Sequence, residues 1–143
     1  MQNGSPETIN LFVYGTLLRG FPKSSFLQQP YRAEFAGEGR VRGYLYDAGS
    51  FPAFVPDESG PEVVGEIYRI TDPDLVLDTL DTIEGYNTTH PERSLYVRKE
   101  VPAICDGKEL QVMVYVYNLP VQNLPRIEFG DYRRYVRESD DSR

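Results

Sequence analysis

The sequence of 143 residues lacks tryptophan and contains a single cysteine and a single histidine. A lone cysteine cannot form a disulfide within the chain, so Cys105 fits a reducing compartment. An enzyme with a cysteine nucleophile would need His90 as its base, but His90 falls in an expected loop. The His, Cys and Asp residues also lack the spacing of metal ligands, so we expect no bound metal.

Basic residues and long apolar runs are scarce as well. Lys and Arg number 15 against 22 Asp and Glu, which gives a net charge of −7. The arginines are scattered apart from Arg133-Arg134, and so we expect no nucleic-acid partner. No apolar run approaches the roughly 18 residues of a membrane span, and the first residues do not resemble a secretory signal. These absences predict no membrane partner and a cytoplasmic location.

What the chain does contain suits one folded domain. We place this domain at residues 9–135 and expect flexible ends at residues 1–8 and 138–143. Hydrophobic residues make up 40% of the sequence, enough for a core. The aromatic residues are 11 Tyr and 7 Phe, and tyrosine suits strands that bury a ring while keeping a hydroxyl near water or a polar cavity.

Short strands separated by turns dominate the pattern. The expected strands are Ile9 to Tyr14, Gly39 to Tyr46, Phe51 to Val55, Val63 to Ile70, Leu95 to Val101 and Leu110 to Tyr117. Asp106-Gly107 predicts that the last two pair as a hairpin. A helix is expected from Asp72 to Glu84, with Asp72 as its N-cap and Gly85 as its stop, and a shorter one within Phe21 to Gln29. The simplest architecture is an α+β fold: a small, mostly antiparallel β-barrel of about six strands with one or two packed helices.

Glu84 is a candidate catalytic base because of its position in the expected helix. It follows Leu80 by four residues and Leu77 by seven, which places it on the apolar side. Asp78 and Asp81 are expected on the opposite, solvated face. Burial and the negative end of the helix dipole would both raise the pKa of Glu84, as a general base near neutral pH requires. A glutamate that faces water from the last turn is the alternative.

The segment Tyr14-Gly15-Thr16-Leu17 is the second candidate. A buried strand that ends in glycine can turn sharply and present successive backbone N–H groups to a cavity. Such groups would hold an anion or a developing oxyanion. A plain tight turn is the alternative interpretation.

Six short segments occur along the chain in a characteristic order. They are Leu11 to Leu17, Val64 to Tyr68, Leu80 to Tyr86, Tyr96 to Arg98, Val112 to Tyr117 and Ile127 to Tyr132. This ordered set resembles the gamma-glutamylcyclotransferase-like family, in the small single-domain branch that includes gamma-glutamylamine cyclotransferase. The resemblance covers about residues 9–135.

The resemblance implies an enzyme of the lyase or acyltransferase type that needs no cofactor. The α-amine of a γ-glutamyl amide would attack its own γ-carbonyl and release 5-oxoproline with a free amine or amino acid. Glu84 would be the general acid/base. The substrate-binding residues would be Tyr14, Gly15, Thr16, Leu17, Tyr96 and Tyr117.

Two alternatives stay open at this point. A non-catalytic module could bind a small anion in the same cavity, although an inward-facing Glu84 would repel it and therefore favours the enzyme. Arg98 would either pair with a substrate carboxylate or face solvent. Residues 87–95 depart from the family pattern, so the sequence does not define the leaving amine, and it does not define the oligomeric state either.

Overall fold

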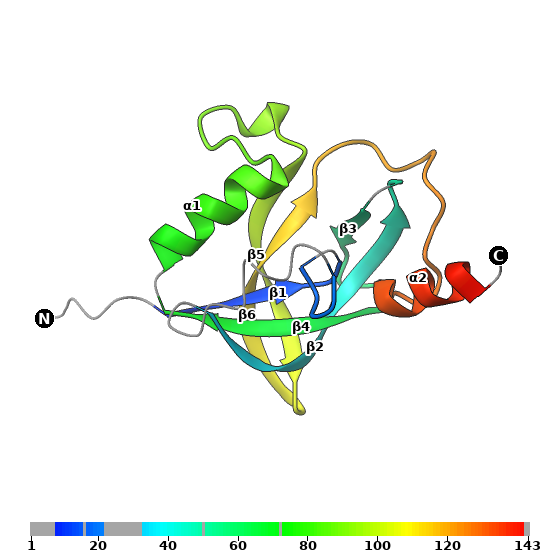
Figure 1. Cartoon of the computed structure of the whole chain (residues 1–143), viewed down its shortest axis with the longest axis horizontal. Helices are drawn as coiled ribbons and strands as arrows, with labels where there is room; N and C mark the ends of the chain where they lie inside the picture. Colours follow the sequence, from blue (N-terminus) through cyan, green and yellow to red (C-terminus); the bar gives the residue numbers. More distant parts are fainter. Residues whose placement is uncertain (1–7, 16, 22–32, 50, 72, 142–143) are drawn as a thin grey trace, which may run out of the picture.

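The computed structural model describes residues 8–15, 17–21, 33–49, 51–71 and 73–141. These residues form six strands, two α-helices and one short 3-10 helix (Figure 1). The strands are β1 (Ile9–Val13), β2 (Ala33–Asp47), β3 (Pro52–Pro56), β4 (Glu62–Ile70), β5 (Tyr96–Cys105) and β6 (Lys108–Tyr117). The helices are α1 (Pro73–Glu84), η2 (Pro91–Arg93) and α2 (Tyr132–Asp141).

The strands form one closed sheet. Their order is β3-β2-β4-β1-β6-β5, and an additional pairing of β2 with β5 closes five of them into a barrel with β3 beside β2. The closing pair is Arg40 with Ile104. Only β1 and β6 run parallel, through Leu11 and Met113. The predicted α+β class and mostly antiparallel barrel are therefore confirmed.

The β5–β6 hairpin forms where the Asp-Gly signal predicted it. The two strands pair from Tyr96 with Tyr117 down to Cys105 with Lys108. The two turn residues, Asp106 and Gly107, have φ angles of 53° and 76°, the left-handed region that this tight turn requires. β5 extends beyond its predicted end because the turn allows pairing up to the last residue on each side.

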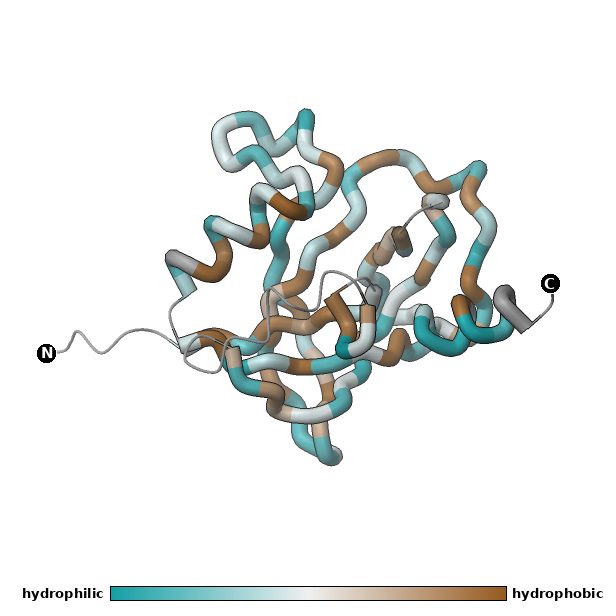
Figure 2. The backbone as a smooth tube through the Cα atoms, in the orientation of Figure 1, coloured by the Kyte–Doolittle hydropathy of each residue, from teal (hydrophilic) through white to brown (hydrophobic). Residues whose placement is uncertain are grey.

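β1 is buried on both faces, as its apolar run predicted. Phe12 and Tyr14 belong to the cluster inside the barrel, whereas Leu11 and Val13 pack with Leu80 of α1 in a second cluster. Figure 1 shows α1 on one side of the barrel and α2 at the other, and Figure 2 shows apolar positions recurring along α1. β1 therefore separates the barrel interior from the layer beneath α1.

α1 ends at Glu84, as predicted, through the glycine that follows it. Gly85 has a φ of 72°, and its N–H donates to the carbonyl of Thr82 at 3.4 Å. The N–H of Tyr86 donates to the carbonyl of Asp81 at 2.8 Å. These two bonds make a Schellman motif, which fixes the direction of the last turn and of Glu84.

Other sequence expectations fall outside the described residues or differ from the structure. The N-cap Asp72 lies outside them, and so does the expected short helix except for Phe21. The chain from Glu138 was expected to be a flexible end, but α2 continues to Asp141. The described residues contain no helix long and apolar enough to cross a membrane.

Contacts with the barrel explain α2, whose polar sequence gives little sign of a helix. Tyr132 is buried in the cluster inside the barrel. The hydroxyl of Tyr135 donates to Asp47 at 2.7 Å, and the guanidinium of Arg133 donates to Glu66 at 3.1 Å. The helix is thus stabilised by partners on β2 and β4 that lie far away in sequence.

Candidate active site

A small cavity lies where β1, β3, β5, β6 and the end of α1 meet. Its lining residues are Phe12, Val13, Tyr14, Gly15, Leu17, Phe51, Pro52, Glu84, Tyr96 and Tyr115. Its volume is about 20 Å³, which is room for one water-sized group. Most of the wall is apolar, and the polar side chains are the three tyrosines and the glutamate.

The cavity brings together most of the site residues predicted from the sequence, which are Tyr14, Gly15, Leu17, Glu84 and Tyr96. Thr16 lies outside the described residues.

Tyr117 is not among the described residues that line the cavity. Its ring packs edge-on against Tyr96, with a centroid distance of 5.6 Å. Tyr115 does line the cavity, and sequence reasoning missed it. Because side chains alternate along a strand, Tyr115 shares a face of β6 with Tyr117, and this periodicity was the signal that could have found it.

Gly15 allows the chain to pass close to β3. A Cβ atom at Gly15 would lie 2.3 Å from Cγ of Pro52, so no other residue fits without displacing β3. The N–H of Leu18 donates to the carbonyl of Gly15 at 2.9 Å and closes a tight turn. Gly15 and Leu17 thereby both reach the cavity wall.

Glu84 is in the last turn of α1, and it lines the cavity. Leu80 and Leu77, on the same side of the helix, are buried, as the spacing predicted. Burial raises the pKa of the tyrosine hydroxyls at positions 14, 96 and 115, and the nearby Glu84 carboxylate raises it further. The negative charge of Glu84 is therefore close to all three hydroxyls.

The prediction that Asp81 is solvated is wrong, because it is only 9% exposed. Asp81 follows Leu77 by four residues, which places it at the edge of the buried face. Its carboxylate accepts hydrogen bonds from Nε of Arg98 at 2.8 Å and from Nη2 at 3.2 Å. It also accepts the hydroxyl of Tyr115 at 2.7 Å. Arg98 is thus engaged by Asp81 in a bidentate pair instead of facing solvent, whereas Asp78 is exposed as predicted.

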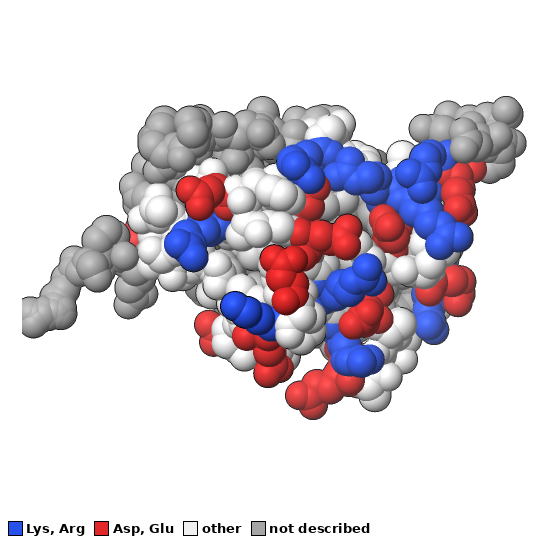
Figure 3. Space-filling view, turned by 90° about the horizontal axis from the view of Figure 1, so that it is seen from below, with Lys and Arg blue, Asp and Glu red and all other residues white. Residues whose placement is uncertain are grey.

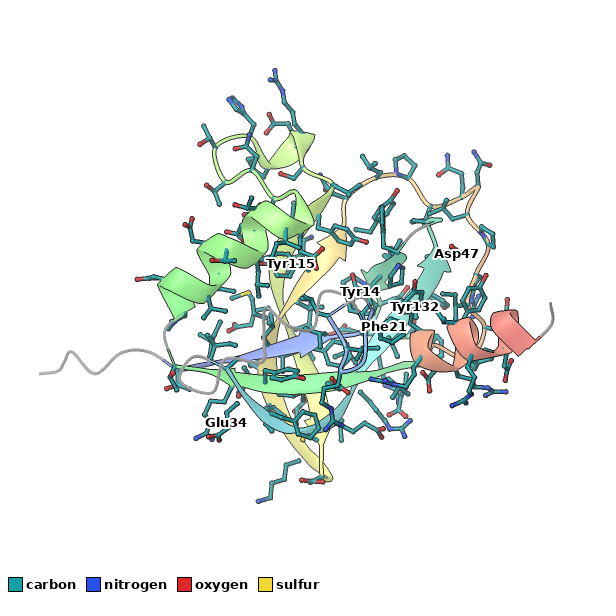
Figure 4. All side chains as sticks on the ribbon, viewed as in Figure 1. Tyr14, Phe21, Glu34, Asp47, Tyr115 and Tyr132 are labelled. Atoms are coloured by element: carbon teal, nitrogen blue, oxygen red, sulfur yellow. The ribbon has the colours of Figure 1, made fainter. Side chains whose placement is uncertain are left out.

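Each tyrosine that lines the cavity donates its hydroxyl proton to another group of the protein. Tyr14 donates to the backbone carbonyl of Tyr115 at 2.6 Å. Tyr96 donates to the carbonyl of Pro52, and Tyr115 to Asp81. Figure 4 shows Tyr115 beside α1 and Tyr14 nearer the middle of the barrel. These bonds fix the three hydroxyl groups from three different directions.

The segment that follows α1 is ordered by its own hydrogen bonds. The side chain of Asn87 accepts the N–H groups of Thr89 at 3.0 Å and His90 at 3.1 Å. The N–H of Asn87 donates to the hydroxyl of Ser94 at 2.7 Å. His90 is half exposed, and its Nδ1 lies 3.4 Å from Glu92, so its described partner is a carboxylate and not a thiol.

A larger hollow of about 540 Å³ lies over β2, β5 and the β3–β4 connection. It contains none of the site residues predicted from the sequence. Its charged side chains are exposed, and Arg40 pairs with Glu62 at 3.7 Å. Figure 3 shows acidic and basic side chains interspersed over the face it draws. Most of the site residues predicted from the sequence line the smaller cavity instead.

Comparison with known proteins identifies the family of this chain. The family described as gamma-glutamyl cyclotransferase, AIG2-like, matches residues 11–134. The chain belongs to this family. The match spans the barrel from β1 to the first turn of α2 and includes every described residue that lines the cavity. The recognition made from the ordered segments is confirmed.

Individual members agree with this assignment. The gamma-glutamylcyclotransferase family protein YtfP of Escherichia coli K12 is 31% identical over 126 residues, which cover 87% of this chain and 96% of YtfP. The crystal structure of an AIG2-like protein from Mus musculus aligns with a TM-score of 0.67 and 28% identity, over 85% of this chain and 87% of that one.

YkqA of Bacillus subtilis shares the fold at 23% identity, with a TM-score of 0.73. The alignment covers 94% of this chain but only 43% of YkqA.

Proposed function

We propose that the protein cyclises a γ-glutamyl amide, releasing 5-oxoproline and a free amine or amino acid, with Glu84 as the general acid/base. The observation that carries the proposal is the position of Glu84. It projects from the end of α1 into a small cavity that is also lined by Gly15, Leu17 and three tyrosines. The family to which the chain belongs supports the same reaction class.

In this reaction the α-ammonium of the substrate first gives one proton to the carboxylate of Glu84. The resulting amine forms a bond to the γ-carbonyl carbon and closes a five-membered ring. Glu84 then returns the proton to the departing nitrogen as its bond to that carbon breaks. The remaining extra proton on the ring nitrogen passes back to Glu84 or to the released amine. No external nucleophile is needed, because the attacking amine belongs to the same molecule as the carbonyl.

The cavity also offers support for the charge that develops on the carbonyl oxygen. In our proposal the backbone N–H groups of Gly15 and Leu17, together with Thr16 between them, bind the oxyanion or the substrate carboxylate. Gly15 and Leu17, the two of these residues that the structure describes, line the cavity. The largely apolar wall strengthens such hydrogen bonds, because they act in a low dielectric.

The first test is release of 5-oxoproline from a panel of γ-glutamyl amides with different leaving amines. We expect Glu84→Gln to lower kcat by about 100-fold or more, the usual contribution of a positioned general base. The glutamine keeps the size of the side chain, so substrate should still bind. Glu92→Gln is the matched control, because Glu92 is an exposed glutamate that pairs only with His90 among the described contacts.

Two results would contradict the proposal. Release of 5-oxoproline at an unchanged rate by Glu84→Gln would exclude Glu84 as the base. Failure of the whole panel to react, together with binding of a small anion to wild type and Glu84→Gln alike, would favour a non-catalytic module.

A further inference from the structure

The polar side chains that line the cavity share one hydrogen-bonding character. Among the described lining residues, the polar side chains are those of Tyr14, Tyr96, Tyr115 and Glu84. A phenol has a single hydrogen to donate, and each of the three phenols already gives it to a protein acceptor. What remains on the oxygens of Tyr96 and Tyr115 is the capacity to accept, whereas the oxygen of Tyr14 already accepts a hydrogen bond from the backbone of Phe54.

The direction of these hydrogen bonds follows from their partners. Tyr14 and Tyr96 bond to backbone carbonyls, which can only accept. Tyr115 bonds to Asp81, whose carboxylate oxygens also accept two hydrogen bonds from Arg98. The hydroxyl of Tyr115 must therefore donate to Asp81 and keep its free lone pair for another donor.

The charge of the cavity agrees with this polarity. The positive charge of Arg98 is balanced by Asp81, at 2.8 Å. Glu84 adds a negative charge close to the three hydroxyls, whose pKa values it raises. In a wall that is otherwise apolar, this charge attracts a cation more strongly than it would in water and repels an anion equally. The volume of about 20 Å³ suits a group no larger than an ammonium.

We propose that the phenol oxygens of Tyr96 and Tyr115, with Glu84, form a subsite for a primary ammonium group, and that Asp81 and Arg98 are positioning residues that keep Tyr115 an acceptor. This inference rests on the proposed function in one respect: the ammonium is taken to be the α-ammonium of a γ-glutamyl group. The substrate carboxylate then binds elsewhere, toward the backbone N–H groups of Gly15 and Leu17.

The subsite gives the reaction its geometry. An ammonium bound there lies beside Glu84, which takes one of its protons. The two hydrogens left on the amine stay bonded to phenol oxygens, and the new lone pair lies along the N–H bond that Glu84 broke, so the γ-carbonyl carbon must be held beside Glu84 for the amine to attack it. Tyr115 is held by Asp81, and Asp81 is held by Arg98, so the orientation of the nucleophile is set by a chain of hydrogen bonds that begins on β5.

The test compares three ligands that cannot cyclise: norvaline, butylammonium, which lacks the carboxylate, and pentanoate, which lacks the ammonium. Binding to the full-length protein is measured by calorimetry or NMR titration. We expect butylammonium to bind, and norvaline to bind at least about tenfold more tightly than pentanoate, because the two share a carboxylate and only norvaline adds charge-assisted hydrogen bonds from an ammonium. Pentanoate that binds as tightly as norvaline would overturn the subsite.

Variants test the roles of the individual residues. Tyr115→Phe should weaken butylammonium about tenfold, because it removes one acceptor. Tyr135→Phe is the matched control, since Tyr135 also donates to an aspartate at 2.7 Å but lies on α2. Asp81→Asn offers Tyr115 a donor and lets its hydroxyl turn toward the cavity, so the preference for butylammonium over pentanoate should fall. If a folded Asp81→Asn protein keeps the same preference for butylammonium over pentanoate, Asp81 has only a structural role and the proposal is contradicted.

Assaying 5-oxoproline release on the same preparations separates this inference from the proposed function. If the protein releases 5-oxoproline but shows no preference for the ligands that carry an ammonium, the subsite is overturned and the proposed cyclisation is supported. A clear preference for ammonium without release from any γ-glutamyl amide supports the subsite and overturns the cyclisation.

Discussion

At the scale of single residues, the pair of Asp81 and Arg98 is the most consequential contact that the helix pattern did not reveal. Both side chains are largely buried, with 12% and 23% of their surfaces exposed. A buried ion pair adds little net stability over apolar residues, but removal of one partner leaves the other charge without compensation. The pair is therefore better understood as a device that holds Tyr115 than as a source of stability.

The same contact makes a prediction about stability. Arg98→Met should lower the free energy of unfolding by about 3 kcal/mol, because the carboxylate of Asp81 loses both charged hydrogen bonds. Urea denaturation measures the change. Arg126→Met is the control, since Arg126 is exposed and lies over the ring of Tyr44, 4.4 Å from its centroid. Its effect should stay within about 0.5 kcal/mol. Equal losses in the two variants would show that Asp81 does not depend on Arg98.

Sequence reasoning could find Glu84 but not the roles of Asp81 and Tyr115, for a physical reason. The orientation of Glu84 depends on helix spacing and on the glycine that ends α1, and both are local. The burial of Asp81 depends on an arginine from β5, which the sequence places 17 residues away without indicating contact. Tyr115 shares a strand face with the predicted Tyr117, but it lines the cavity because β6 lies between β1 and β5, a long-range pairing that the local pattern does not give.

At the scale of elements, the turn after β1 and the start of β3 are packed too closely to be independent. Gly15→Ala would place a Cβ 2.3 Å from Cγ and 2.8 Å from Cδ of Pro52. We expect a loss of about 1–3 kcal/mol in the free energy of unfolding, the cost of overpacking. Because Pro52 also accepts the hydroxyl of Tyr96, displacement of β3 should lower kcat as well.

Gly49→Ala is a useful comparison for this prediction. A Cβ at Gly49 would meet no atom within 4 Å, although its φ of 105° strains any other residue. Alanine at position 49 should lower the free energy of unfolding only through backbone strain, and it should leave kcat unchanged. If both variants lose kcat to the same extent, the close packing of Gly15 on Pro52 is not what positions the cavity.

A second link between elements joins the turn after β1 to α2. The buried carboxylate of Glu66 on β4 accepts the backbone N–H of Arg19 at 3.0 Å and its Nε at 3.2 Å. It also accepts Nη2 of Arg133 at 3.1 Å, and Nη1 of the same arginine donates to the carbonyl of Arg19 at 2.7 Å. α2 thus braces the segment that carries Leu17, a role that a charged, polar helix sequence does not disclose.

At the scale of the whole molecule, the barrel was predictable, but the strand pairing that closes it was not. Alternating burial along β2 and the Asp-Gly turn between β5 and β6 are visible in the sequence because strand periodicity and turn chemistry are local. The pairing of Arg40 with Ile104, which closes the barrel, joins two exposed strand segments with no distinctive pattern. Long-range pairing of this kind depends on the twist of the complete sheet.

Closure of the barrel buries three tyrosine hydroxyls, and this determines how the molecule responds to alkali. Burial raises the pKa of Tyr14, Tyr96 and Tyr115 above the usual value of about 10, so above that pH the unfolded chain releases protons that the folded protein keeps. The stability they contribute is complete below pH about 10 and is lost as the pH rises toward their raised values. The free energy of unfolding should then fall by about 1.4 kcal/mol per pH unit for each tyrosine, or about 4 kcal/mol for the three together.

Urea denaturation between neutral pH and about pH 11 measures this slope, with tyrosinate absorbance to show that the phenols ionise as the protein unfolds. Tyr115→Phe removes one of the three groups and should make the slope shallower by about 1.4 kcal/mol per pH unit. A difference in tyrosinate absorbance between wild type and Tyr115→Phe that appears before unfolding would mean that the hydroxyl of Tyr115 ionises inside the folded barrel. In that case Tyr115 does not keep its proton for Asp81 as the pH rises.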